Sequence, residues 1–107
     1  MPAWTVRLKE SVVDDLRSLG RKEGRAVLEA ALERLGVDPL AETRNLKTLR
    51  PNPVAHRELR MLGKYRVLFL VDRAGYTVTI VLIGEKRGEF LLVQGERFTA
   101  HESHSAE

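Results

Sequence analysis

Residues 58–87 read ELRMLGKYRVLFLVDRAGYTVTIVLIGEKR and contain two apolar runs, Tyr65–Asp72 and Tyr76–Gly84. Both runs are rich in β-branched and aromatic residues, which suit the half-buried surface of a sheet. The three residues between them, Arg73–Gly75, form a link of the length and composition of a hairpin loop, because glycine accepts the positive φ that such loops need. The stretch therefore predicts an antiparallel hairpin.

Further strands extend this hairpin. A strand over Val54–Leu62 is expected to enter it through a turn at Gly63, and the apolar run Phe90–Val93 predicts a last strand. Near the N-terminus, Trp4–Lys9 alternates apolar and polar residues with the period of a half-buried strand. The chain thus predicts a C-terminal antiparallel sheet of three to four strands that an N-terminal strand joins.

Two helices are predicted between the first strand and this sheet. Ser11 has the position of an N-cap whose hydroxyl accepts the backbone N–H of Asp14, and the first helix runs to Leu19. The second runs from about Arg21 to Leu35, with Gly36 as its C-terminal cap. Its apolar stripe consists of Val27, Leu28, Ala31, Leu32 and Leu35. The element order predicts an α+β fold with a helical hairpin on one face of the sheet.

The length of 107 residues corresponds to one domain. We expect it to span residues 1–98, with 99–107 as a flexible tail because they are short of apolar groups. The absence of cysteine excludes disulfides and thiolate metal sites, and no apolar run reaches the roughly 20 residues of a membrane span. The N-terminus lacks the apolar core of a signal peptide. These features predict a cytoplasmic protein without membrane partner or cofactor.

Positive charge is concentrated in the middle of the chain. The net charge is +3, and residues 44–66 contain seven Lys or Arg residues and one acid, Glu58. Such a segment raises the local concentration of anionic partners, and either nucleic acid or an acidic protein segment would qualify. A role in solubility alone is the alternative.

The chemistry that this charge favours is phosphodiester cleavage by 2′-hydroxyl attack. That reaction needs a base, an acid and positive charge on the developing phosphorane, and the planar fork of arginine suits the last task. Arg60, Arg66, Lys86 and Arg87 lie at the ends of neighbouring predicted strands, although the unknown register leaves their convergence open. His101 and His104 are too few for a metal site.

Three short motifs resemble the RelE/ParE superfamily of bacterial toxins. They are Glu-Leu-Arg at 58–60, Tyr-Arg at 65–66 and Gly-x-Lys-Arg at 84–87, and the predicted elements stand in the order of that family over residues 4–93. The resemblance implies a RelE-like fold and a toxin that a cognate antitoxin neutralises, often by covering the basic face. In the nuclease branch the toxin enters the ribosome and cuts mRNA without a metal.

Carried over by position, the resemblance gives Arg66 a phosphate-stabilising role and makes Lys86 or Arg87 the second cation. His56 and Glu58 stand where lysines are usual, and Phe90 stands near a usual tyrosine. Glu85 or His56 would then carry the proton, or His101 or His104 if the tail folds over the sheet. The remaining candidates, for RNA binding, are Arg57, Arg60, Lys64, Arg50 and Lys47.

Two other functions stay open within this resemblance. A ParE-like toxin would inhibit DNA gyrase and leave mRNA intact. A non-toxic member of the family would only bind its antitoxin.

Overall fold

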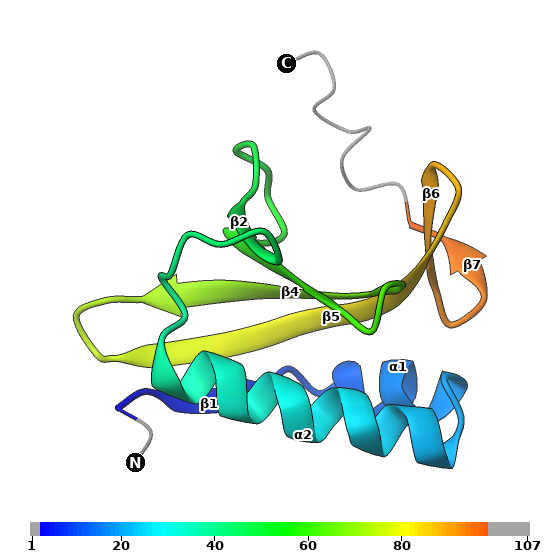
Figure 1. Ribbon diagram of the computed structural model, residues 1–107, viewed down its shortest axis with the longest axis horizontal. Helices are drawn as coiled ribbons and strands as arrows, with labels where there is room; N and C mark the ends of the chain where they lie inside the picture. The colour runs from blue at the N-terminus through cyan, green and yellow to red at the C-terminus, as the bar shows by residue number, and fades with distance from the viewer. Residues whose placement is uncertain (1–2, 99–107) are drawn as a thin grey trace.

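The computed structural model describes residues 3–98. These residues form two helices and seven strands (Figure 1). In chain order the elements are β1 (Thr5–Leu8), α1 (Val12–Ser18), α2 (Arg21–Val37), β2 (Leu46–Thr48), β3 (Arg57–Met61), β4 (Tyr65–Asp72), β5 (Thr77–Arg87), β6 (Phe90–Val93) and β7 (Glu96–Arg97). The predicted tail, residues 99–107 with His101 and His104, lies outside the described residues.

The strands form one sheet in the order β2-β3-β4-β5-β6-β7, and β1 pairs in parallel with β5. Both helices lie on one face of this sheet, and the opposite face is open (Figure 1). The predicted α+β class, with a helical hairpin on one face of the sheet, is confirmed. β2 and β7 were not predicted, because three and two residues are too few to show an alternating pattern.

The turns show how the sequence sets the register of the central strands. Between β3 and β4, Leu62 and Gly63 both have positive φ, 51° and 78°, which is the twist that tight hairpins require. Between β4 and β5 the positive φ belongs to Tyr76 at 52°, so the prediction that Gly75 supplies it was wrong. Gly75 instead approaches Asp72, whose Oδ1 accepts its backbone N–H at 3.2 Å.

The helices differ from the prediction at their ends. The hydroxyl of Ser11 makes no capping hydrogen bond, since this residue already has helical dihedral angles. α2 continues through Gly36 to Val37, and the carbonyl of Gly36 accepts the N–H groups of Ala3 and Trp4 at 2.9 and 3.0 Å. The helix therefore ends at Asp38 rather than at a glycine cap.

The core lies between the helices and the sheet. From α2, Val27, Ala31 and Leu35 are fully buried, whereas Leu32 of the predicted stripe is exposed. Gly24 permits close packing of α2 on α1, since a Cβ atom there would stand 2.6 Å from the carbonyl oxygen of Leu16. The two helices thus form the predicted hairpin at a spacing that a larger side chain would increase.

A buried carboxylate joins α1 to the end of the sheet. β1 covers β5 as far as Ile80, and β6 covers it only from Glu85. Asp15 reaches into this gap, where its Oδ2 accepts the N–H of Ile83 at 3.0 Å and its Oδ1 accepts the side-chain amide of Gln94 at 2.7 Å. One helical side chain therefore replaces a missing strand and holds the β6–β7 turn.

A second apolar cluster lies on the open face and supports the segments around it. Its members are Ala55, Leu68 and Leu82, with Leu49, Val54, Val81, Leu91, Val93 and Phe98 packed against them. Gly84 lets β6 approach closely, because a Cβ atom there would stand 2.7 Å from the carbonyl oxygen of Leu92. The loop before β3 and the β6–β7 hairpin are thereby fixed on either side of the open face.

Candidate functional site

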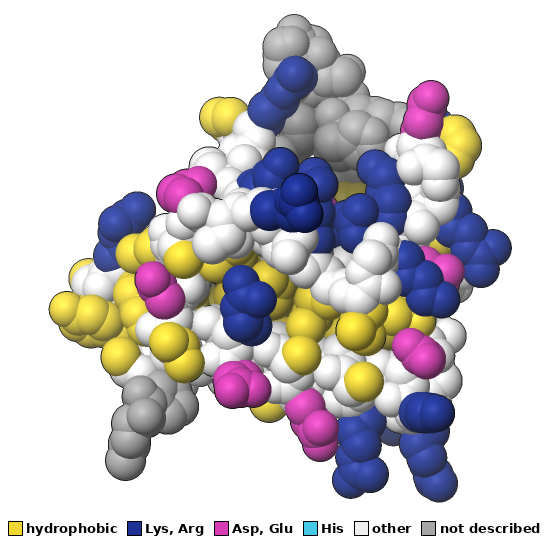
Figure 2. All heavy atoms as spheres, viewed as in Figure 1, with side chains coloured by type: hydrophobic (Ala, Val, Ile, Leu, Met, Phe, Trp, Pro, Cys, Tyr) yellow, Lys and Arg dark blue, Asp and Glu magenta, His cyan; other side chains and the backbone are white. Residues whose placement is uncertain are grey.

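Cations from neighbouring strands meet on the open face of the sheet. Arg66 of β4 stands directly opposite Arg60 of β3, and on its other side it is opposite Gly84 of β5. Lys86 follows Gly84 by two residues, so the alternation of a strand puts it on the same face. Figure 2 shows Lys and Arg side chains gathered above the sheet, in the upper half of the view.

One acid stands within this group. The Oε2 atom of Glu58 lies 3.1 Å from Nε of Arg66 and 3.7 Å from Nε of Arg60. Lys47 of β2 is the cross-strand partner of Glu58 on its other side and is exposed. We call Lys47, Glu58, Arg60, Arg66 and Lys86 the open-face cluster. Like charges that face each other across a sheet destabilise it, and Glu58 offsets this repulsion between the two arginines.

Arg66 is the most enclosed cation of the open-face cluster. Its side chain is 13% exposed, against 41% for Arg60, and its Nη1 donates to the carbonyl oxygen of Tyr65 at 3.1 Å. Burial lowers the pKa of Arg66; the carboxylate of Glu58 opposes this change and the charge of Arg60 adds to it. Arginine remains charged after any such shift, so the site keeps its positive charge.

The tyrosine of the Tyr-Arg motif faces the other side of the sheet. The hydroxyl of Tyr65 donates to Oε1 of Glu23 at 3.0 Å and so connects β4 to α2. Burial, and then Glu23, raise the pKa of Tyr65 above its ordinary value. The hydroxyl therefore stays protonated at neutral pH, and it takes a structural part.

Three of the predicted site residues form a separate ion-pair group. Glu85 is opposite Tyr65 in the sheet and thus lies on the face away from Arg66. Its Oε2 lies 3.2 Å from Nε of Arg87 and 3.9 Å from Nζ of Lys64. The structure does not bring Glu85 or Arg87 to Arg66, which leaves Glu58 as the carboxylate beside that arginine.

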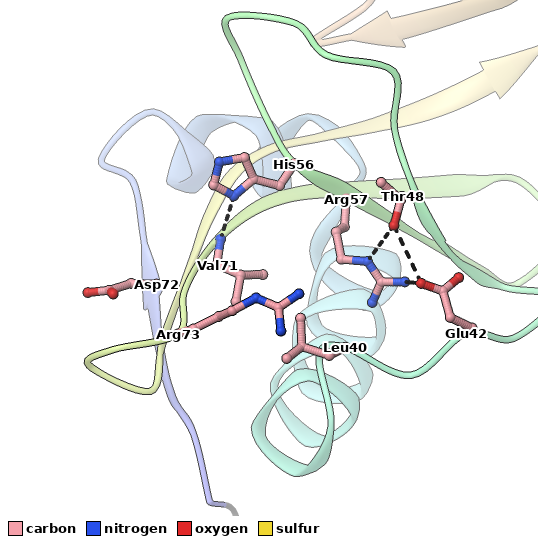
Figure 3. A pocket seen from close by; sticks show the side chains of 8 residues that line it. All are labelled: Leu40, Glu42, Thr48, His56, Arg57, Val71, Asp72 and Arg73. Atoms are coloured by element: carbon pink, nitrogen blue, oxygen red, sulfur yellow. Dashed lines mark hydrogen bonds and ion pairs between the residues drawn. The ribbon is translucent and has the colours of Figure 1, made fainter.

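His56 lies near the other end of the central strands. Its Nδ1 accepts the N–H of Val71 at 3.0 Å, and Val71 is five residues from Arg66 along β4, roughly 16 Å. His56 lines a pocket of about 410 Å³ (Figure 3). The pocket residues are Leu40, Glu42, Thr48, His56, Arg57, Val71, Asp72 and Arg73. This histidine is therefore not placed to exchange a proton at Arg66.

Arg57 forms the inner wall of the same pocket, and its placement corrects the prediction that it binds RNA. Its side chain is 5% exposed. Its guanidinium donates to the carbonyl oxygens of Pro39 and Ala41, to Oγ1 of Thr48 and to Oε2 of Glu42. A guanidinium whose donors are used in this way holds the 38–45 connection on the sheet and has no fork to offer a phosphate.

Replacing Arg57 is accordingly expected to affect stability more than binding. Arg57→Met would remove the donors that two backbone carbonyl groups accept, and we expect the free energy of unfolding to fall by about 2 kcal/mol. Urea titration would measure this, with Arg73→Met as the control at an exposed arginine of the same pocket. A loss of RNA affinity in a folded Arg57→Met protein would contradict the structural assignment.

Two further cations lie near the edges of the sheet. Arg50 is exposed in the loop before β3, and its carbonyl oxygen accepts the side-chain amide of Asn52 at 2.7 Å. At the other edge of the sheet, the guanidinium of Arg97 lies 4.0 Å from the ring centre of Phe90, which is 43% exposed. Phe90 is opposite Arg87, so strand parity puts its ring on the face of Glu85 and not on that of Arg66. Arg97 was not among the predicted site residues, because its two-residue strand leaves no pattern in the sequence.

Among residues 3–98 no group of three or more His, Cys, Asp or Glu side chains is arranged to hold a metal ion. Neither helix of the described chain is both long and apolar enough to cross a membrane.

Comparison with known proteins identifies the family. No protein-family model and no curated sequence matches the chain. Among solved structures, it is 31% identical to a chain of the toxin–antitoxin complex RelBE2 of Mycobacterium tuberculosis, with a TM-score of 0.68, over 80% of this chain and 94% of that one. Isolated Escherichia coli RelE toxin shares the fold at 21% identity and a TM-score of 0.61, covering 81% and 89% of the two chains. This chain belongs to the RelE superfamily of toxins.

A third RelE structure agrees. The RelE–RelB complex of Pyrococcus horikoshii OT3 matches at 25% identity and a TM-score of 0.63, over 81% of this chain and 98% of that one. The match covers 89–98% of each of the three neighbouring chains and 80–81% of this toxin.

Proposed function

We propose that this RelE-superfamily toxin arrests translation by cleaving mRNA at the ribosome in the cytoplasm. The observation that carries the proposal is the position of Arg66 on the open face. Arg66 is opposite Arg60 of β3, and Lys86 of β5 lies on the same face. A group of cations on neighbouring strands can bind successive phosphates and stabilise the charge of a phosphorane.

Within this proposal the residues divide by placement. Arg66 holds the scissile phosphate, Arg60 and Lys86 hold it or its neighbours, and Lys47 and Arg50 attract the RNA backbone from the β2 side. Lys64 and Arg87 lie in the ion-pair group with Glu85. They contribute to the positive electrostatic potential that attracts RNA and do not contact it directly. This division follows from strand parity and from the ion pairs described above.

The partner that would neutralise the toxin is a cognate antitoxin. The Mycobacterium tuberculosis and Pyrococcus horikoshii neighbours are toxins in complex with their antitoxins. For the present toxin we propose an acidic segment that is disordered alone and folds over the open face, because such a segment complements exposed cations on a sheet. RNA and antitoxin would then compete for the same arginines.

The test is expression of the full chain alone, followed by primer extension on a reporter mRNA. We expect growth arrest and new 5′ ends at codon-phased positions, because cleavage in the ribosome follows the reading frame. Growth arrest with intact mRNA and inhibited supercoiling would overturn the proposal in favour of gyrase. Normal growth at high expression would indicate a family member that only binds its antitoxin.

A further inference from the structure

Glu58 stands at the centre of the cations that the proposed function assigns to RNA. It is opposite Lys47 of β2, and its Oε2 atom lies 3.7 Å from Nε of Arg60 on its own strand and 3.1 Å from Nε of Arg66 on β4. Its side chain is 17% exposed, so water screens this charge only in part. An RNA phosphate that approaches Arg66 must therefore approach a negative charge at the same time.

The geometry shows which part of Arg66 is occupied. A guanidinium binds phosphate most strongly through two parallel N–H groups, and one such pair consists of Nε and Nη2. The Nε member of this pair already faces Oε2 of Glu58 at 3.1 Å, and Nη1 already donates to the Tyr65 carbonyl. The same Oε2 atom faces Nε of Arg60 at 3.7 Å. One carboxylate thus engages the two arginines best placed for phosphate.

We propose that Glu58 is a built-in competitor of RNA phosphate for Arg66. In the free toxin its carboxylate occupies the Nε edge of Arg66, and RNA gains that edge only by displacing it. This inference rests on the proposed function, and it assigns to Glu58 the setting of RNA affinity. The carboxylate also stabilises the two opposed arginines while no RNA is bound.

A purely orienting role for Glu58 predicts the opposite effect on binding. If the carboxylate only aimed Arg66 at the phosphate, its removal would weaken RNA binding. If it competes, its removal adds one unit of positive charge to the binding surface and frees a donor pair. The sign of the change in affinity therefore separates the two roles.

The experiment compares Glu58→Gln with wild type in the full chain. The probe is a fluorescent single-stranded RNA with 2′-deoxy substitutions, which cannot be cleaved by 2′-hydroxyl attack, titrated over a series of salt concentrations. We expect E58Q to bind about tenfold more tightly, with a salt dependence steeper by about 0.7, the contribution of one additional phosphate contact on a single strand. Glu33→Gln is the matched control, since Glu33 is exposed on α2, away from the open face, and its substitution changes the net charge equally. E33Q is expected to change affinity less than about twofold.

Two outcomes would overturn the inference in distinguishable ways. If Arg66→Ala weakens RNA binding while E58Q leaves it unchanged or weakens it, Glu58 does not compete and the proposed function stands. If neither substitution changes RNA binding, the proposed function fails and the inference fails with it. Should E58Q melt below the assay temperature, Glu58→Asp replaces it, because the shorter side chain lengthens the contact to Arg66 and carries the same expected sign.

Discussion

Arg66→Ala is expected to abolish translation arrest while the protein remains folded. In a cell-free system, the concentration that halves protein synthesis should rise about a hundredfold or more, the usual cost of removing one preorganised electrostatic group from a reaction centre. We expect this effect because Arg66 is opposite Arg60 on one side and opposite Gly84, which has no side chain, on the other. Primer extension on the same samples should show loss of the codon-phased 5′ ends.

The controls for this prediction separate charge from geometry. Arg66→Lys keeps the charge and loses the planar fork, so we expect partial activity that is closer to the alanine variant than to wild type. Arg73→Ala removes an exposed arginine from the β4–β5 turn, far from the open-face cluster, and should leave arrest unchanged. Wild-type arrest by a folded Arg66→Ala protein would refute the assignment of the site.

We expect Asp15→Ala to lower the free energy of unfolding by about 3 kcal/mol, more than the Arg57→Met substitution described above. The substitution leaves the N–H of Ile83 buried without an acceptor, and it releases the side chain of Gln94. Hydrogen bonds to a charged group are worth about 1.5–3 kcal/mol, and an unsatisfied buried donor adds to the cost. Urea unfolding followed by circular dichroism would measure the change as a shift of the midpoint at constant slope.

The neighbouring residue provides the matched control. Asp14 is exposed and faces Arg17 at 3.5 Å, so Asp14→Ala should change stability by less than about 0.5 kcal/mol. Equal effects of the two substitutions would show that the buried contacts of Asp15 are not what stabilises this end of the sheet. Asp15→Asn should fall between them, because the amide keeps one acceptor oxygen and loses the charge.

The sequence was sufficient to predict the frame of the fold. The runs Tyr65–Asp72 and Tyr76–Gly84 gave the central hairpin, and the spacing of Val27, Ala31 and Leu35 gave the buried face of α2. These patterns are strong because burial repeats along each element at its own period. β2, β7 and the positive φ of Tyr76 depend on local backbone geometry, which leaves little trace in residue types.

The site could be predicted less well, and the reason is register. Arg57 alternates in phase with Leu59 and Met61, so strand parity could have indicated that it faces the core. The ion pair of Glu58 with Arg66 required the exact pairing of two strands through the turn at Leu62 and Gly63. The role of Asp15 was not predicted, since nothing near it in the sequence reveals an N–H in need of an acceptor on a strand 68 residues away.

The pairing of β1 with β5 also bears on how the protein is made. Thr5 is opposite Thr77 and Leu8 is opposite Ile80, so β1 has no partner strand until residues 77–80 have been synthesised. Such long-range contacts must form late and make folding slow, because a large loop has to close before they stabilise the chain. A nascent chain that stops before Ile80 also lacks Gly84 and Lys86. A fragment that ends there therefore lacks both the partner strand of β1 and one cation of the open-face cluster.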